Sequence, residues 1–236
     1  MPLPGENKNS RETDDHLGVA QAGRSSRRNL ILIVAVVVGV VWLQQTGFLD
    51  TAYEGDPLPE VQLQEVQALL DASPLVPHIG NPDGTVKIIE FFDYRCGHCR
   101  SMATIVDDVV NENSDVDVVL IEYPVLGRES ELAARFALAA ALQGGYATFH
   151  RALMFSAIPY TDDALMELGA NLGMDAERLK TDAYGDEVEA IMLDNLRIAK
   201  ALDVSGTPTF VIGKRLVVGA IDKGSFTGLV AAARNP

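Results

Sequence analysis

Two cysteines, three positions apart, constrain the fold of this chain more than any other feature of its sequence. Cys96 and Cys99 are its only cysteines. The apolar run Val86–Phe92, interrupted by two charges, precedes them and is typical of a buried strand, and a helical pattern of apolar residues follows them. Positions three apart share one face of a helix, so the two sulfurs can meet and form a bond. The chain is therefore expected to run from a strand directly into a helix at a reactive cysteine pair.

The spacing favours redox chemistry over the alternatives. A Cys-x-x-Cys at such a junction is typical of a thioredoxin-type redox motif. The pair can also be half of a zinc site or a soft copper(I) site, but zinc needs two further ligands. Nitrogen ligands can come only from histidines, and no two of them form a matching pair: His16, His78, His98 and His150. A structural disulfide at this spacing would crosslink almost no chain. We therefore expect a redox-active disulfide, with no metal and no other cofactor.

The N-terminal region differs in character from the rest of the chain. Residues 1–28 are polar and predict a disordered cytoplasmic tail. Residues 29–49 are uncharged and largely apolar, and about 20 such residues span a bilayer. Basic residues precede this stretch, which favours a cytoplasmic N-terminus. We expect an uncleaved inner-membrane anchor or a cleaved signal peptide, with a buried core helix as a third alternative. Either of the first two exports the remainder into an oxidising compartment, where cysteine pairs carry out disulfide chemistry.

Residues 50–79 predict a connecting region, and residues 80–236 a single domain. Tyr53–Pro59 is interpreted as a linker, and Glu60–Ala72 as a short amphipathic helix. That helix can pack on its own domain or serve self-association, so a homo-oligomer stays possible. The formal charge of −14 makes nucleic acid and anionic lipid poor partners.

The order of elements after the cysteine pair is helix, strand, helical block, strand, strand and helix. The strand Val116–Tyr123 is apolar enough to be covered on both faces. Helical patterns then continue to Leu202, and Gly213-Lys214 can join two further strands in a hairpin. The segment Ser225–Arg234 predicts the last helix.

These features together resemble the DsbA-like thiol–disulfide oxidoreductases of the bacterial periplasm, and most closely their membrane-linked and copper-stress-associated members. The resemblance rests on the element order, on Glu90–Cys99 and on Gly206–Phe210, about 110 residues downstream, and the turn at Asn81-Pro82 with the lead-in Phe91–Tyr94 is closest to the membrane-linked members. It implies an α/β thioredoxin fold with an all-helical insertion between the second and third core strands, at about residues 128–203. The family's usual dipeptide between the cysteines is Pro-His. Gly97-His98 stands here instead, as in eukaryotic protein disulfide isomerase.

The residues and the resemblance together assign roles around the cysteines. A cysteine in the first turn of a helix is stabilised as a thiolate, so Cys96 is expected to be the exposed, attacking sulfur. His98 can donate to that thiolate or add positive charge beside it, and Cys99 is expected to be the buried resolving thiol. The resemblance implies that Pro208 is cis and lies against the cysteines, where Gly206 and Thr207 can bind an extended client. A trans proline in an ordinary loop is the alternative.

Glu90 is a carboxylate inside an apolar strand, six residues before Cys96. One interpretation places it at a sheet edge, where it reaches water. The other is a buried acid that relays the proton of Cys99 and whose pKa burial raises. His78 and His150 are interpreted as ordinary residues, the latter as a packing residue.

Three functions remain open. The first is disulfide formation in exported cysteine-containing client proteins, with re-oxidation by a quinone-linked membrane partner. The second is an isomerase or reductase kept reduced by a membrane electron donor, which Gly97-His98 and Thr207 favour. The third is a non-catalytic copper- or zinc-binding module.

Overall fold

The computed structural model describes residues 33–34, 36–38, 53–73 and 75–235. The chain divides into two units, Met1–Thr51 and Ala52–Pro236. In the first unit the described residues are helical and exposed, while the predicted tail and most of the predicted anchor at residues 29–49 lie outside the described residues. Among the residues that are described, none belongs to a helix with the length and apolar character needed to cross a membrane.

The second unit is built on one mixed sheet with the strand order β1-β6-β5-β3-β4-β2. Its two central strands, β3 and β4, are parallel, and every other neighbouring pair is antiparallel. All of β4 is buried, as is all of β3 except Lys87, which explains their near-continuous apolar sequences. The strands are β1 (Asp56–Pro57), β2 (His78–Gly80), β3 (Val86–Phe92), β4 (Val116–Glu122), β5 (Thr209–Ile212) and β6 (Arg215–Val218).

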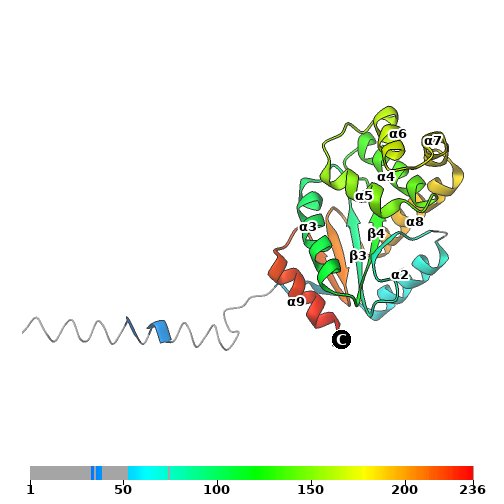
Figure 1. Ribbon diagram of the computed structural model, residues 1–236. Helices are drawn as coiled ribbons and strands as arrows, with labels where there is room; N and C mark the ends of the chain where they lie inside the picture. Colours follow the sequence, from blue (N-terminus) through cyan, green and yellow to red (C-terminus); the bar gives the residue numbers. More distant parts are fainter. Residues whose placement is uncertain (1–32, 35, 39–52, 74, 236) are drawn as a thin grey trace, which may run out of the picture. The chain divides into compact units, whose positions relative to one another are not determined.

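Helices cover both faces of the sheet and form a separate cluster in the middle of the chain (Figure 1). The cluster, α4 to α8, lies between β4 and β5 in the sequence, so the predicted α/β architecture with a helical insertion is confirmed. The helices are α2 (Glu60–Ala72), α3 (Gly97–Glu112), α4 (Arg128–Ala141), α5 (Tyr146–Phe155), α6 (Asp162–Asn171), α7 (Ala176–Ala183), α8 (Asp186–Ala201) and α9 (Lys223–Ala233).

The alternation of side chains along β3 divides the core into two parts. Ile88 and Phe92 belong to a large cluster with residues of α3, α9 and the helical insertion. Ile89 and Phe91 belong to a smaller cluster with residues of α2 and the end of α8. Because side chains alternate along a strand, Glu90 faces the same side as Ile88 and Phe92, which is the side of α3.

The interpretation of Tyr53–Pro59 as a linker is wrong. Asp56 and Pro57 form β1, which pairs with β6 at the edge of the sheet. A two-residue strand is too short to show a hydrophobic period, so the sequence gives no signal for it. Helix α2 also packs on its own domain, where Val66 is buried and Gln62 donates to the carbonyl of Ala201 at 3.2 Å. The compact unit thus begins earlier than the boundary at residue 80.

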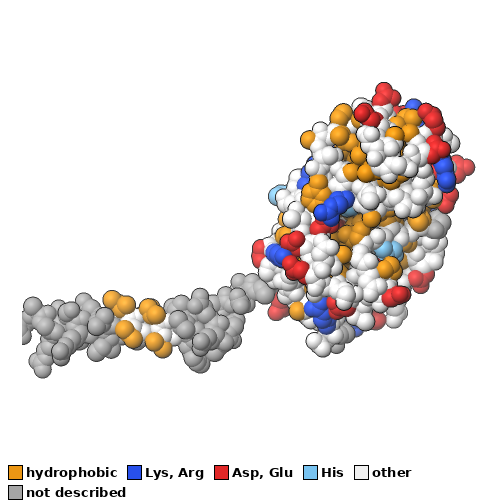
Figure 2. Space-filling view, in the orientation of Figure 1, with side chains coloured by type: hydrophobic (Ala, Val, Ile, Leu, Met, Phe, Trp, Pro, Cys, Tyr) orange, Lys and Arg blue, Asp and Glu red, His pale blue; other side chains and the backbone are white. Residues whose placement is uncertain are grey.

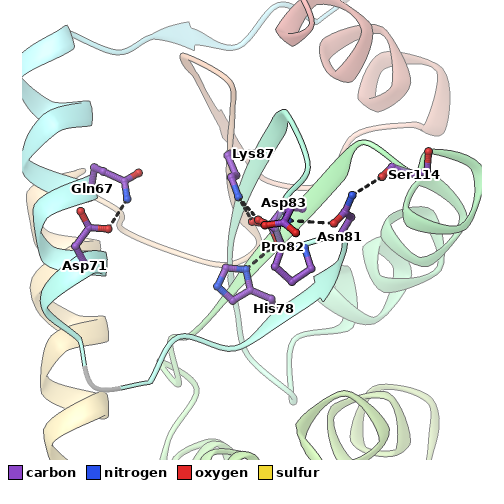
Figure 3. A network of polar contacts seen from close by, with 9 residues as sticks. Gln67, Asp71, His78, Asn81, Pro82, Asp83, Lys87 and Ser114 are labelled. Carbon is purple, nitrogen blue, oxygen red and sulfur yellow. Dashed lines mark hydrogen bonds and ion pairs between the residues drawn. The ribbon is translucent and has the colours of Figure 1, made fainter.

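Polar contacts join the start of β4 to its two neighbouring strands, β3 and β2 (Figure 3). The carboxylate of Asp117 is fully buried and accepts from Lys87 Nζ of β3 at 2.6 Å. Its other oxygen lies 2.8 Å from His78 Nδ1 of β2. Nearby, the side chain of Asn81 accepts from the backbone N–H of Asp83 at 3.0 Å and donates to the carbonyl of Ser114 at 2.9 Å. These hydrogen bonds hold the turn that precedes β3.

The surface of the second unit agrees in character with the composition. Acidic side chains are spread over the visible face, and hydrophobic side chains gather in its middle (Figure 2). The protein has a formal charge of −14, so this surface repels polyanions at long range.

Candidate active site

Cys96 is the N-cap residue of α3, and its position follows from a tight turn after β3. The backbone N–H of Cys96 donates to the carbonyl of Asp93 at 3.0 Å. Its sulfur accepts a hydrogen bond from the backbone N–H of Cys99 at 3.3 Å. The sulfur therefore faces the positive end of the helix dipole, which stabilises a thiolate. Cys96 is only 7% exposed, less than the sequence suggests, because residues of a second loop cover it.

That second loop precedes β5 and carries the predicted client-binding residues. The Thr207–Pro208 peptide bond is cis, as the resemblance implied. The thiol of Cys96 donates to the carbonyl of Thr207 at 3.4 Å, and the hydroxyl of Thr209 donates to the carbonyl of Gly206 at 2.8 Å. Antiparallel pairing of β3 with β5 brings this loop to the cysteines, although more than one hundred residues separate them in the sequence.

Cys99 is fully buried one turn into the helix. Burial raises the pKa of its thiol strongly, and the hydrogen bond with Cys96 adds to this rise. Hydrogen bonds from the backbone of Asp93 and the side chain of Thr207 lower the pKa by smaller amounts. The two sulfurs thus have unequal surroundings, and Cys96 is the less buried of the two residues.

Glu90 is buried in the middle of the central strand and is 3% exposed, so the sheet-edge interpretation is wrong. Burial, with a smaller contribution from Asp107, raises the pKa of Glu90 from 4.5 to about 8. Its Oε1 atom is buried and has no hydrogen-bond partner among the described residues. The carboxyl faces the side of the sheet that α3 covers, which carries Cys99. Its proposed proton relay to Cys99 stays a prediction.

His98 does not take the position that the sequence suggested. Its side chain is exposed, and within the described part of the chain it makes no hydrogen bond to Cys96. The hydrogen bond to the Cys96 sulfur comes from the helix backbone instead. His150, by contrast, packs edge-on against Phe92 with ring centroids 4.9 Å apart, which confirms its packing role.

Arg100 is a residue near the site that the sequence did not single out. Its guanidinium donates to the carbonyl oxygens of Tyr94, Met154 and Ser156 at 3.0, 3.2 and 2.8 Å. It also donates to the Tyr160 hydroxyl at 2.6 Å. One side chain therefore ties the start of α3 to the end of α5. An arginine directly after the second cysteine is the only sequence signal for it.

Glu122, the last residue of β4, was also missed. Its Oε1 atom accepts hydrogen bonds from the hydroxyls of Tyr94 at 2.7 Å and Tyr146 at 2.8 Å. The Tyr94 hydroxyl lies 3.0 Å from His150 Nδ1, so this histidine has a polar contact besides its packing role. The sequence signal for Glu122 is a charged residue directly after the apolar run that ends at Ile121.

The rim of the site combines a buried acid with exposed apolar residues. Asp93 is buried and accepts from the backbone N–H groups of Arg95 at 2.8 Å and Leu126 at 2.9 Å. Arg95 is exposed and pairs with Glu129 at 3.1 Å. Leu126 and its neighbour Val125 are exposed beside this loop. Within the described residues, no group of three or more His, Cys, Asp or Glu side chains is placed to hold a metal ion.

Comparisons with known proteins agree with this geometry. A family model described as "DSBA-like thioredoxin domain" matches residues 87–229. The thiol:disulfide interchange protein DsbA of Bordetella pertussis is 26% identical over 175 residues, which cover 71% of this chain and 81% of that protein. A thioredoxin-like oxidoreductase from Silicibacter pomeroyi DSS-3 is 36% identical with a TM-score of 0.68, covering 72% of this chain and 98% of that chain. For alpha-DsbA2 from Wolbachia pipientis, a thiol-disulfide exchange protein, the identity is 25%, the TM-score 0.66, and the coverage 73% and 94%.

Proposed function

The chain belongs to the DSBA-like thioredoxin domain family and is a thiol–disulfide oxidoreductase, and from this we propose that it forms disulfides in exported, cysteine-containing client proteins. The observation that supports this most strongly is the unequal pair of sulfurs. Cys96 sits at the positive end of α3 and against the Thr207 carbonyl, whereas Cys99 is fully buried. This arrangement suits an attack on Cys96 followed by release of Cys99.

The reaction begins from the Cys96–Cys99 disulfide. A client thiolate attacks the sulfur of Cys96, a client–Cys96 bond forms, and the electron pair of the broken bond goes to Cys99. Cys99 then takes up a proton, because burial raises the pKa of its thiol. A second client thiolate attacks the client sulfur of the mixed disulfide, and Cys96 leaves as a thiolate. The backbone N–H at the start of α3 and the helix dipole stabilise that thiolate.

The loop Gly206–Pro208 supports the binding of an extended client segment. It lies beside Cys96, and a backbone next to a sulfur can hydrogen-bond a client chain whatever its side chains are. The exposed apolar side chains of Val125 and Leu126 adjoin the loop that Asp93 holds, and they can contact apolar client residues. We expect broad client specificity from such a surface.

An isomerase or reductase is the second candidate. The same two sulfurs carry out the reverse reaction when a membrane donor keeps them reduced, and Gly97-His98 and Thr207 favour this candidate because they resemble the corresponding residues of the disulfide isomerases. The reduced enzyme would then attack an incorrect client disulfide with Cys96. The third candidate, a copper- or zinc-binding module, receives no support from a third ligand within the described residues.

Thiol trapping in cells distinguishes the first two candidates. We expect the cysteines to be mostly in the disulfide state, which supports an oxidase served by a quinone-linked membrane partner. A mostly dithiol state would instead support the isomerase or reductase. In vitro, the Cys96 thiolate of Cys99→Ser should attack a client disulfide and release one client sulfur as a thiolate, and the mixed disulfide should accumulate because the resolving thiol is gone. Cys96→Ser should abolish exchange. Full activity of Cys96→Ser in a refolding assay would overturn the assignment of Cys96 as the attacking residue.

For localisation, we propose that residues 29–49 anchor the chain in the inner membrane and that the catalytic unit lies in the periplasm. Cleavage within this segment would give a soluble periplasmic enzyme instead. Membrane fractionation of the full chain tests this proposal, and recovery of the intact chain from the cytoplasm would overturn it.

A further inference from the structure

Two buried carboxyl groups, those of Glu90 and Glu122, lie on the neighbouring strands β3 and β4. Glu90 pairs with Leu120, and Phe92 pairs with Glu122, so the two glutamates are two register positions apart. Both face the side of the sheet that α3 covers, because side chains alternate along each strand. Glu90 is 3% and Glu122 1% exposed.

Neither carboxyl has a cation to balance its charge. Within the described part of the chain, no lysine or arginine forms an ion pair with Glu90 or Glu122. Each also keeps one buried oxygen without a hydrogen-bond partner there, Oε1 of Glu90 and Oε2 of Glu122. A carboxylate in this situation carries a large desolvation cost, which a neutral carboxyl largely avoids.

The groups around Glu122 add no positive charge. From α5, Tyr146 donates to Glu122, and burial lowers the pKa of the neighbouring His150 to about 3, so this imidazole is neutral. From the loop after β3, Tyr94 donates to Glu122, and Asp93 raises the pKa of Glu122 by repulsion. From α8, the uncharged Asn195 donates to the backbone carbonyl of Glu122 at 3.2 Å.

The charges near Glu90 lead to the same result. Asp107 of α3 raises the pKa of Glu90, and Arg151 of α5 pairs with Asp107 rather than with either glutamate. The guanidinium of Arg100 is bound by carbonyl and hydroxyl oxygens. Burial raises the pKa of Glu122 well above its ordinary value, repulsion from Glu90 adds to this, and the two tyrosine hydroxyls act in the opposite direction.

We propose that Glu122 is a positioning residue that is held as a neutral acid. In this form it places no second negative charge beside Glu90 while Glu90 gives its proton to the Cys99 thiolate. When the disulfide is reduced, the electron pair goes to Cys99, the proton of Glu90 follows, and Glu90 becomes the carboxylate. An ionised Glu122 would oppose this step, because the negative charges of Glu122 and Glu90 repel each other in a buried site and each hinders the ionisation of the other. The inference rests on the proposed function in that the cysteines must cycle between disulfide and dithiol.

Infrared spectroscopy of the full chain tests the proposal through the C=O stretch of neutral carboxyl groups. Near neutral pH we expect a buried neutral-acid band that is lost in Glu122→Gln. We expect the same band to shift as the pH rises through about 8, since the neighbouring Glu90 then becomes a carboxylate. Tyr146→Phe, which keeps the carboxyl and the aromatic ring, should move the band to higher frequency because one donor to Oε1 is removed.

The outcomes separate the proposal from a purely structural role. A spectrum in which Glu122→Gln removes no neutral-acid band means that Glu122 is ionised, and this overturns the proposal. A Glu122 band that stays fixed while Glu90 loses its proton overturns the coupling between the two glutamates. Should Glu122→Gln fail to fold, the band shift in Tyr146→Phe still shows whether Glu122 is a neutral acid. The pH titration uses no client protein, so a failure of the enzyme on client proteins is a separate result.

Discussion

Strand β4 carries two buried acids near its two ends, and the protein surrounds them in opposite ways. Asp117, near the start, accepts from the cationic Lys87 and lies against the imidazole of His78. Glu122, at the end, accepts from the hydroxyls of Tyr94 and Tyr146 and has Glu90 as its acidic neighbour. The side chains of Asp117 and Glu122 also face opposite sides of the sheet.

The difference separates a structural acid from a functional one. The Asp117 cluster joins β2, β3 and β4 far from the cysteines, and its charge has a partner. The Glu90–Glu122 pair lies on the side of the sheet that α3 covers, and among the described residues no lysine or arginine pairs with it. Ionisable groups that are buried without a counter-ion are costly, and they gather at functional sites where a shifted pKa is useful. The comparison therefore assigns a stabilising role to Asp117 near the start of β4 and a role in proton transfer to Glu122 at its end.

The largest expected effect is a pH dependence of stability that originates at the glutamate pair. The folded state holds the Glu90 proton more tightly than the unfolded state, since its pKa rises from 4.5 to about 8. Stability is thus fully present at low pH and falls as pH rises through this window. We expect Glu90 to lower the free energy of unfolding by about 3 kcal/mol between roughly pH 5 and pH 8. Urea unfolding at several pH values measures this, and Glu90→Gln should make the slope shallower. Identical slopes in the two proteins would contradict the buried-acid assignment.

A smaller effect is expected at the other end of the strand. Asp117→Asn removes the charge that faces Lys87 and His78, and we expect a loss of about 2 kcal/mol in the free energy of unfolding. This is less than the loss for a fully buried ion pair, because the Lys87 side chain is 53% exposed and can return to water. The matched control is Lys87→Met, with an expected loss under about 1 kcal/mol. The reduction potential of the cysteine pair should not change in either variant. A changed potential would contradict the assignment of a purely structural role to Asp117.

The smallest stability effect is expected for Glu122→Gln, the matched amide replacement on the same strand. The amide oxygen can still accept from Tyr94 and Tyr146, and one neutral group replaces another. We expect the free energy of unfolding to change by less than about 1 kcal/mol near neutral pH. Chemical denaturation of this variant alongside Asp117→Asn gives the comparison directly. A loss as large as that of Asp117→Asn would mean that the two acids are structural in the same sense.

The sequence predicts the frame of this protein well because its main signals are local. The strand that ends at Phe92, the helix that begins after Cys96 and the helical block each have their own periodicity or cap. The cis bond at Pro208 followed from a resemblance between motifs. Burial of Glu90 in the central strand decided between two interpretations that the sequence left open.

The remainder depends on contacts between distant residues. The hydroxyl of Tyr94 reaches Glu122 across 28 positions and His150 across 56, and no local pattern encodes such pairs. The same holds for Arg100, whose partners on α5 lie more than fifty positions away. The role suggested for His98 rested on its place between the cysteines, but the backbone geometry of the helix start turns its ring outward and supplies the hydrogen bond itself.

The two outer strands of the sheet bear on how such an enzyme avoids being trapped by the chains it handles. In the described part of the protein, one border is the two-residue β1, which contains Pro57, and the other is the three-residue β2. Neither offers a row of free backbone groups long enough for an unfolded polypeptide to add itself as a further strand, and a proline blocks one of them outright. A partly folded chain can thus exchange its sulfurs and leave, without seeding an intermolecular β-aggregate on its catalyst.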